Sequence, residues 1–117
     1  SIVAKVREGD PTVVNTSETL HMGTIGGAKA VGLGDQLGSI EVGKKADIIL
    51  VDLKRAHLTP THDVVSHLVY AANGYDVDTV ICDGKILMQN RKVLSLDEEL
   101  VLEKSQKAAM DLLERAK

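Results

Sequence analysis

The stretch that most constrains the fold is residues 38–52, in which a glycine-bounded segment with a charged tip runs into four consecutive aliphatic residues. This run, Ile-Ile-Leu-Val, lies between two aspartates. Aliphatic residues without polar alternation are typical of a strand that is buried on both faces. The stretch therefore predicts a short strand over 39–43, a tight turn, and a buried strand over 46–53.

Two helices are predicted before this stretch. Residues 1–8 form the end of a helix, because a Gly-Asp-Pro sequence follows them and proline cannot continue a helix. Residues 17–31 have apolar side chains at three- and four-residue spacing, with Thr16 or Ser17 as the N-cap. Three glycines lie inside this helix, Gly23, Gly26 and Gly27. They indicate close packing against another element; the alternative, a phosphate-cradling loop, lacks a preceding strand.

The second half of the chain carries clear turn signals. Residues 54–62 contain a proline and no periodicity, which predicts a loop. Asp63 is predicted to cap a helix that Asn73-Gly74 closes. Asp83-Gly84 lies between two β-prone runs and predicts a hairpin over residues 77–89, since both central residues of a type I′ turn need positive φ.

A capping box at residues 95–98 predicts an amphipathic last helix over 96–116. Its predicted buried stripe consists of Leu102, Ala109, Leu113 and Ala116. The resulting order is helix, two strands, helix, hairpin and helix, an α+β arrangement with about four strands. Because the apolar strands need cover and few strands are present, we predict that further strands come from another segment or another chain.

Composition bounds the protein class. The 117 residues suffice for one modest core, built from aliphatic residues because the chain has two Tyr and neither Phe nor Trp. A formal net charge of −3 argues against a nucleic-acid or membrane partner. No apolar run approaches the length of a membrane span. The single Cys82, predicted to be buried, is consistent with a reducing, cytoplasmic compartment. The first residue is Ser, so the chain is expected to be a trimmed or excised piece.

Residues 38–44 have the G-x-x-x-x-G-K spacing of a phosphate-binding loop. The full signature continues with Ser or Thr, where this chain has Lys45, and with a helix, where a strand is predicted. We therefore favour a β-turn that presents two solvated lysines, Lys44 and Lys45.

Other catalytic patterns are incomplete. His57 and His62 flank a proline-containing loop, and His62 and His67 would lie about 140° apart around a helix. The sequence has no H-x-H, H-E-x-x-H or Cys/His pairing and no G-x-S-x-G elbow. Its carboxylates are spread over loops and the last helix, as expected for solvated charges. We predict that this chain holds no catalytic, cofactor-binding or metal-binding residue.

Three blocks nevertheless resemble the C-terminal region of metal-dependent amidohydrolases. Residues 38–52 resemble the family's G-(S/T)-(I/L)-x-x-G-K-x-A-D-hydrophobic-D block. Residues 22–33 are similar to the helix that precedes it, and residues 77–85 to a strand and turn that follow it. Within the superfamily, residues 10–12, 60–63 and 68–72 most resemble the cytosine-deaminase-like branch. That branch includes S-adenosylhomocysteine/5′-methylthioadenosine deaminases and triazine and N-ethylammeline chlorohydrolases.

This resemblance implies a (β/α)8 barrel with a divalent metal, zinc or iron, that activates water for attack on an amidine-like carbon with release of ammonia. It also implies that the metal ligands lie upstream of this segment. The chain then divides into barrel helices over 1–37, strands and a helix of a composite β-sandwich over 38–94, and an amphipathic helix over 95–117.

Two functional hypotheses follow. In the first, the chain is the C-terminal part of such a deaminase and is inactive alone, with the missing N-terminal part of the enzyme as its partner. In the second, it is an assembly module that pairs its open strand edges with a second copy of itself, as a homo-oligomer. A nucleotide-binding function is a third reading and requires Lys44 or Lys45 to touch a phosphate.

Overall fold

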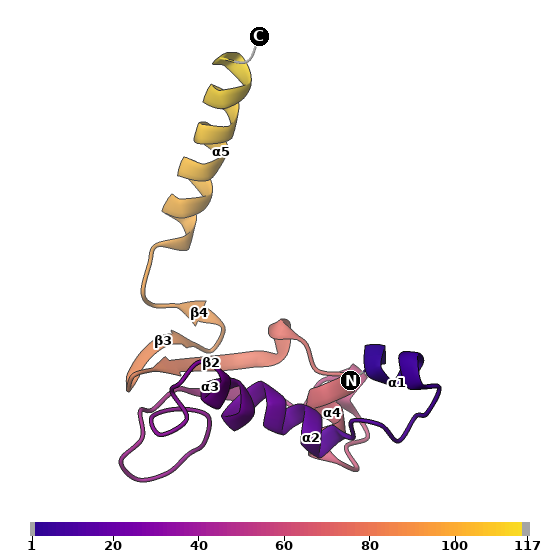
Figure 1. Ribbon diagram of the computed structural model, residues 1–117. Helices are drawn as coiled ribbons and strands as arrows, with labels where there is room; N and C mark the ends of the chain where they lie inside the picture. The colour runs from indigo at the N-terminus through magenta and orange to yellow at the C-terminus, as the bar shows by residue number, and fades with distance from the viewer. Residues whose placement is uncertain (1, 116–117) are drawn as a thin grey trace.

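The computed structural model describes residues 2–115 as an α+β arrangement in which helices from the N-terminal half lie beside a four-stranded sheet (Figure 1). A last helix projects away from both (Figure 1). The helical elements are α1 (Ile2–Glu8), α2 (Thr16–His21), the π-helix η1 (Met22–Gly26), α3 (Gly27–Ala30), the 3-10 turns η2 (Ala56–Leu58) and η3 (Gly74–Asp76), α4 (Val64–Tyr70) and α5 (Glu98–Arg115). The strands are β1 (Ile48–Val51), β2 (Val77–Cys82), β3 (Lys85–Gln89) and β4 (Lys92–Val93).

The predicted helix over 17–31 is present but interrupted. Asn15, not Thr16 or Ser17, is its N-cap, because its side chain accepts the backbone N–H of Glu18 while the Glu18 carboxylate accepts that of Asn15. The five-residue π-helix η1 follows, and Thr24 inside it has non-helical backbone angles. The glycine at position 26 permits this geometry, since a Cβ there would lie 2.9 Å from the His21 carbonyl oxygen.

The prediction of a first strand over residues 39–43 is wrong. Residues 39–43 form turns, because Gly38 and Gly43 both have positive φ and interrupt an extended path. The second strand exists as β1, and its partner is β2, to which it runs antiparallel. It is not buried on both faces, since Ile49 and Leu50 remain 57% and 53% exposed. The sequence indicates a strand that needs cover, and the described residues leave this one uncovered.

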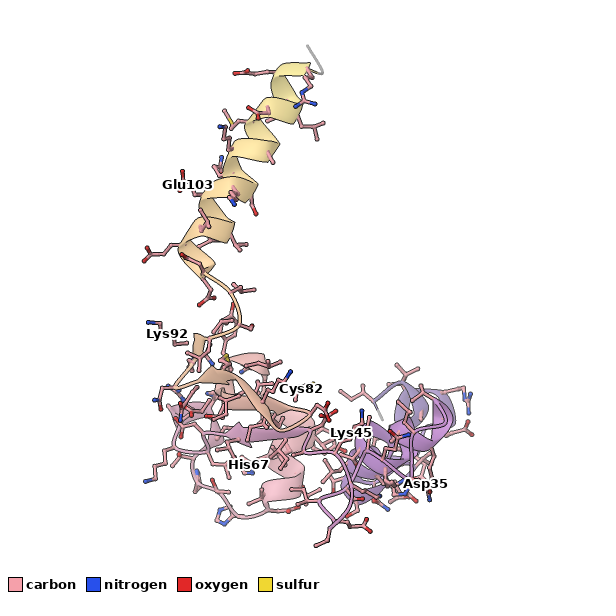
Figure 2. All side chains as sticks on the ribbon, turned by 90° about the vertical axis from the view of Figure 1, so that its left-hand side faces the viewer. Asp35, Lys45, His67, Cys82, Lys92 and Glu103 are labelled. Carbon is pink, nitrogen blue, oxygen red and sulfur yellow. The ribbon has the colours of Figure 1, made fainter. Side chains whose placement is uncertain are left out.

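The predicted hairpin is confirmed. β2 and β3 pair antiparallel through Asp83 and Gly84, whose φ angles of 49° and 76° are those of a primed turn. β4 adds a short fourth strand that the sequence analysis did not identify, so the sheet order is β1-β2-β3-β4. Cys82 was predicted to be buried, but it is exposed at the end of β2, where the strand enters the turn (Figure 2).

The loop and helix between β1 and β2 follow the prediction with one change. Asp63 caps α4, its side chain accepting the Val65 backbone N–H at 3.0 Å. The helix ends at Tyr70, ahead of Asn73, so Asn73-Gly74 does not close it. Instead Asn73 begins the next turn, η3. Lys5 of α1 donates to the Tyr70 hydroxyl at 2.8 Å and so joins the first helix to this one.

The last helix is confirmed, but its cap and its environment differ from expectation. Asp97, rather than Ser95, supplies the capping oxygen, which accepts the Leu100 backbone N–H at 3.1 Å. The predicted stripe is not buried, because Leu102 and Leu113 are 70% and 60% exposed. Ala116 lies outside the described residues. α5 stands clear of the sheet, as the position of Glu103 shows (Figure 2).

The chain is less compact than a typical globular domain of its length. Its accessible surface is 9046 Å², whereas a compact protein of this mass exposes about 6,200 Å². The radius of gyration is 19.0 Å, against about 13 Å for a compact domain of this length. Among the described residues, Leu58 is the only large side chain that is fully buried. Large apolar side chains such as Ile49, Leu50 and Leu102 therefore remain exposed. Among residues 2–115, no helix is long and apolar enough to span a membrane.

Candidate functional site

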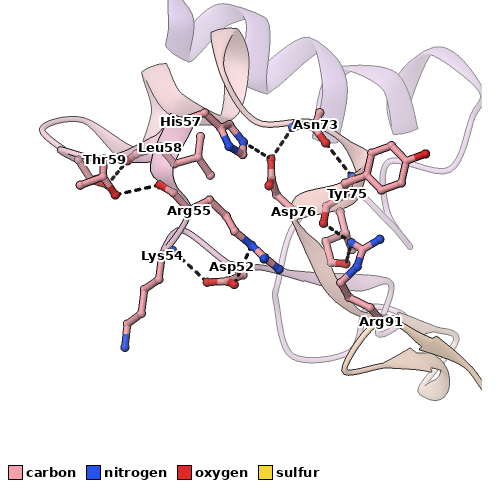
Figure 3. Close-up of polar contacts among 12 residues, drawn as sticks. Asp52, Lys54, Arg55, His57, Leu58, Thr59, Asn73, Tyr75, Asp76 and Arg91 are labelled. Atoms are coloured by element: carbon pink, nitrogen blue, oxygen red, sulfur yellow. Dashed lines mark hydrogen bonds and ion pairs between the residues drawn. The ribbon is translucent and has the colours of Figure 1, made fainter.

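A cluster of polar contacts lies where the loop after β1 meets the start of β2 (Figure 3). Asp76, only 3% exposed, accepts the Asn73 backbone N–H at 2.9 Å and lies 2.9 Å from His57 Nε2. The ionised carboxylate can only accept, so the imidazole donates its Nε2 proton. The Asp76 carbonyl oxygen also accepts the Asp52 backbone N–H at 2.7 Å. Asp76 thus holds the stretch after β1 to the turn that precedes β2.

The partners of Asp76 also set its charge. The pKa of its carboxyl is held below the ordinary value first by the Asn73 N–H and then by His57, with the positive charges of His57 and Arg55 adding to the effect against the cost of burial. A buried carboxylate that stays ionised and takes two donors on one oxygen, Oδ2, acts here as a structural connector. The described residues place no nucleophile beside this pair that would complete a catalytic constellation.

Two neighbouring charges consolidate the cluster. Arg55 Nε lies 3.0 Å from Asp52 Oδ2, and the Lys54 backbone N–H donates to the other Asp52 oxygen at 2.9 Å. On the opposite side, Arg91 donates to the carbonyl oxygens of Tyr75 and Val77, and its guanidinium lies 5.5 Å from the Tyr75 ring centre (Figure 3). These contacts fix the backbone that enters β2.

This cluster differs from the expectation that carboxylates in the loops are solvated. A signal was present in the sequence Asn73-x-x-Asp76, which has the spacing of a capping box. In the structure both of its reciprocal hydrogen bonds are formed. What the sequence does not show is the burial of Asp76, which depends on the approach of His57 from 19 positions away.

The lysine of the G-x-x-x-x-G-K stretch points inward, contrary to the prediction of a solvated side chain. Lys44 Nζ donates to the Gly34 carbonyl oxygen at 3.1 Å and to Ser39 Oγ at 2.6 Å, and it lies 3.2 Å from the Glu41 carboxylate. Its side chain is only 13% exposed. The amine therefore closes its own loop. Lys45, by contrast, is half exposed and lies 3.9 Å from Asp83.

The aspartate that precedes β1 is also structural. Asp47 Oδ1 accepts the Asp83 backbone N–H at 2.7 Å, and the Ala46 carbonyl oxygen accepts the Gly84 N–H at 3.1 Å. The family-like block over 38–52 thus uses its polar residues to close a loop and to hold the tip of the β2–β3 hairpin.

The residues do not fit the divalent metal that the family resemblance implies. Within residues 2–115, no three His, Cys, Asp or Glu side chains come together as a ligand set. His57 is engaged by Asp76, and His67 Nδ1 lies 2.9 Å from the Asp63 carbonyl oxygen one helical turn back. His62 is exposed.

A groove of about 910 Å³ is lined by residues of the α2–α3 helical stretch, β1 and α4. Gly23 and Gly27 line the groove on the helical side without side chains that would fill it. A Cβ at Gly23 would meet no atom within 4 Å. Its apolar side chains include Leu20, Val31, Ile48, Ile49, Leu68 and Val69. The groove is a concave apolar surface suited to packing against another protein segment.

Comparison with known proteins gives consistent results. Residues 2–87 match the profile of the Amidohydrolase family. The chain is 50% identical over 118 aligned residues to the 5′-deoxyadenosine deaminase of Methanobrevibacter smithii, covering all of this chain and 27% of that protein. It is 51% identical over 115 residues to the 5-methylthioadenosine/S-adenosylhomocysteine deaminase of Pelotomaculum thermopropionicum, covering 98% of this chain and 26% of the relative.

Solved structures match as well. A zinc-bound adenosine deaminase from Xanthomonas campestris aligns with a TM-score of 0.86 and 39% identity, over 91% of this chain and 24% of that one. Atrazine chlorohydrolase from Arthrobacter aurescens, complexed with zinc, aligns with a TM-score of 0.73 and 26% identity, over 86% of this chain and 23% of that one. The chain therefore spans about a quarter of the length of the proteins it matches.

Proposed function

This chain belongs to the amidohydrolase family, and on that premise we propose that it is the C-terminal part of a metal-dependent deaminase that acts on an adenosine-type substrate. The observation that carries the proposal is the 50% identity to a 5′-deoxyadenosine deaminase along the whole chain. A substrate of the class of 5′-deoxyadenosine, 5′-methylthioadenosine or S-adenosylhomocysteine is inferred from the names of such relatives.

In this proposal the chain contributes architecture, and chemistry comes from the rest of the protein. The helices over 1–37 form the last helices of a (β/α)8 barrel, and the strands over 38–94 form the C-terminal part of a composite β-sandwich. The groove beside Gly23 and the uncovered face of β1 are the surfaces that the rest of the protein would pack against. The divalent metal, zinc or iron, would be held by the rest of the protein, since the residues described here do not fit it.

A hybrid enzyme tests this proposal directly. The matched segment of the Methanobrevibacter smithii deaminase is replaced by this chain, and ammonia release from 5′-deoxyadenosine is measured with zinc supplied. We expect the hybrid to deaminate and the isolated 117-residue chain to show no turnover. Reinsertion of the relative's own segment controls for the joining procedure. A soluble, zinc-loaded hybrid without activity would contradict the proposal, as would metal-dependent turnover by the isolated chain.

The second candidate is an assembly module that pairs its strand edges with a second copy. The observation that favours it is the position of β1 at the edge of the sheet, with Ile49 and Leu50 exposed. Sedimentation velocity of the isolated chain should then show a dimer or larger species. Leu50→Lys should dissociate it, whereas Leu102→Lys on α5 should not. A monomer at all concentrations would exclude this candidate.

A further inference from the structure

The turn between α4 and β2 places the exposed dipeptide Asn73-Gly74 directly against the buried Asp76 cluster. We propose that Asn73 is a site of spontaneous deamidation, and that the reaction turns the cap of η3 into a second carboxylate beside Asp76 and loosens its connection to His57. The inference concerns this chain's own covalent chemistry and stands independently of the proposed deaminase function.

The reaction needs only water and the two residues. The backbone nitrogen of Gly74 loses its proton to water and attacks the side-chain carbonyl carbon of Asn73. A new C–N bond closes a five-membered imide while the bond to Nδ2 breaks and ammonia leaves. Water then opens the imide at either carbonyl, which gives Asp or isoaspartate at position 73. No oxidant or reductant takes part.

Gly74 makes the attack sterically open. It has no side chain to shield its nitrogen, and a Cβ built at this position would meet no atom within 4 Å. Its φ is not in the left-handed region, so Ala can replace it without backbone strain. Gly74→Ala is therefore a variant that hinders the attack and leaves the fold unchanged.

The cap regulates the reaction. Asn73 Oδ1 accepts the Tyr75 backbone N–H at 2.8 Å, which directs the amide towards Tyr75. Ring closure requires this hydrogen bond to open so that the side chain can turn to Gly74. The folded turn should therefore slow the reaction relative to the unfolded chain, and local opening of η3 should set its rate.

The products disturb the cluster in two ways. Asp at position 73 sets a second negative charge in the same capping box as Asp76, whose side chain accepts the backbone N–H of residue 73 at 2.9 Å. Two like charges at this spacing oppose the ionised form of Asp76. Isoaspartate lengthens the backbone by one carbon, so the reciprocal hydrogen bonds of η3 can no longer form together.

The chain contains its own controls. Its other two asparagines, Asn15 and Asn90, are followed by Thr16 and Arg91, whose side chains crowd the attacking nitrogen. The intact chain is incubated at mildly alkaline pH, and peptides are mapped by mass spectrometry. We expect the mass gain of amide-to-acid conversion at Asn73 well before the other two, its suppression in Gly74→Ala, and faster conversion in denaturant. Equal conversion at all three, persistence in Gly74→Ala, or no acceleration in denaturant would overturn the proposal.

The consequence is tested separately with Asn73→Asp, which mimics one product. Its thermal midpoint should fall below that of the unmodified chain near neutral pH, and the difference should shrink as acid protonates the new carboxyl. Gln106→Glu, which makes the same amide-to-acid change at an exposed position of α5 away from the Asp76 cluster, is the matched control. An Asn73→Asp variant that is as stable as Gln106→Glu at neutral pH would refute the coupling to Asp76.

Discussion

The Asp76 cluster and helix α5 differ in how they accommodate a group that is unfavourable in its surroundings, a buried carboxylate in the first and an exposed apolar stripe in the second. The cluster buries a carboxylate and supplies it with two hydrogen-bond donors, the His57 ring and the Asn73 backbone N–H. The helix carries an apolar stripe and leaves it exposed, with Leu102 and Leu113 in contact with solvent. A buried charge must be paired locally to be tolerated, whereas an apolar face can be left for a partner to cover. The comparison separates what this chain stabilises alone from what it offers to other protein.

The largest expected effect comes from the one fully buried large side chain. Leu58→Ala should reduce the free energy of unfolding by about 2–5 kcal/mol, because it removes buried methyl groups and leaves a cavity. Leu102→Ala, in the exposed stripe, should change it by less than about 0.5 kcal/mol. Urea unfolding of both variants measures the contrast. Similar losses in the two variants would show that α5 packs against the chain in solution.

A smaller effect is expected at the hairpin turn. Gly84 has a φ of 76°, so Gly84→Ala places a Cβ in the left-handed region and should cost about 1 kcal/mol. Gly74→Ala, at a glycine with open space and no positive φ, should be nearly neutral. Thermal unfolding of the pair tests whether backbone conformation, rather than loss of glycine as such, determines the effect.

Acid should weaken the Asp76 cluster. The folded pKa of Asp76 lies below its unfolded value, so the stability that this carboxylate contributes is fully present above the unfolded pKa. It is lost as the pH falls through the folded pKa, which lies below the ordinary value of 3.8 for an aspartate side chain. Asp76→Asn should therefore be less stable than the parent at neutral pH and show a flatter acid response. Unfolding midpoints across this pH range measure it, with Glu103→Gln on α5 as the control.

The smallest effect expected in the isolated chain is the protection of the α5 amides from hydrogen exchange, and this protection should become large in the whole protein. Amide hydrogen exchange in α5 should be poorly protected in the isolated chain, since a helix of this length without tertiary contacts is marginal in water. In the hybrid deaminase the same amides should be protected if the rest of the protein covers the helix. Equal exchange in both settings would show that α5 remains solvated in the whole enzyme.

Local signals in the sequence were sufficient for several elements. The Asp83-Gly84 turn, the Asp63 cap and the Ile48–Val51 strand each depend on neighbouring residues, and all three are present. The strand over 39–43 was wrong because β-prone residues lie there between two positive-φ glycines, and the inward path of Lys44 cannot be read from spacing. The caps were displaced by one or two residues, to Asn15 and Asp97, because several suitable side chains stand together at each helix start.

The sequence by itself determined the family, through three blocks in order, and it indicated that the strands lacked cover. The family follows from the likeness of those blocks to known motifs, and the lack of cover follows from apolar runs in a chain with few strands. Only the tertiary structure decided that β1 pairs with β2, that Lys44 closes its own loop, and that Asp76 is buried against His57. Those outcomes depend on segments that meet in space after folding, and the free energy of a buried charge is set by which donors reach it.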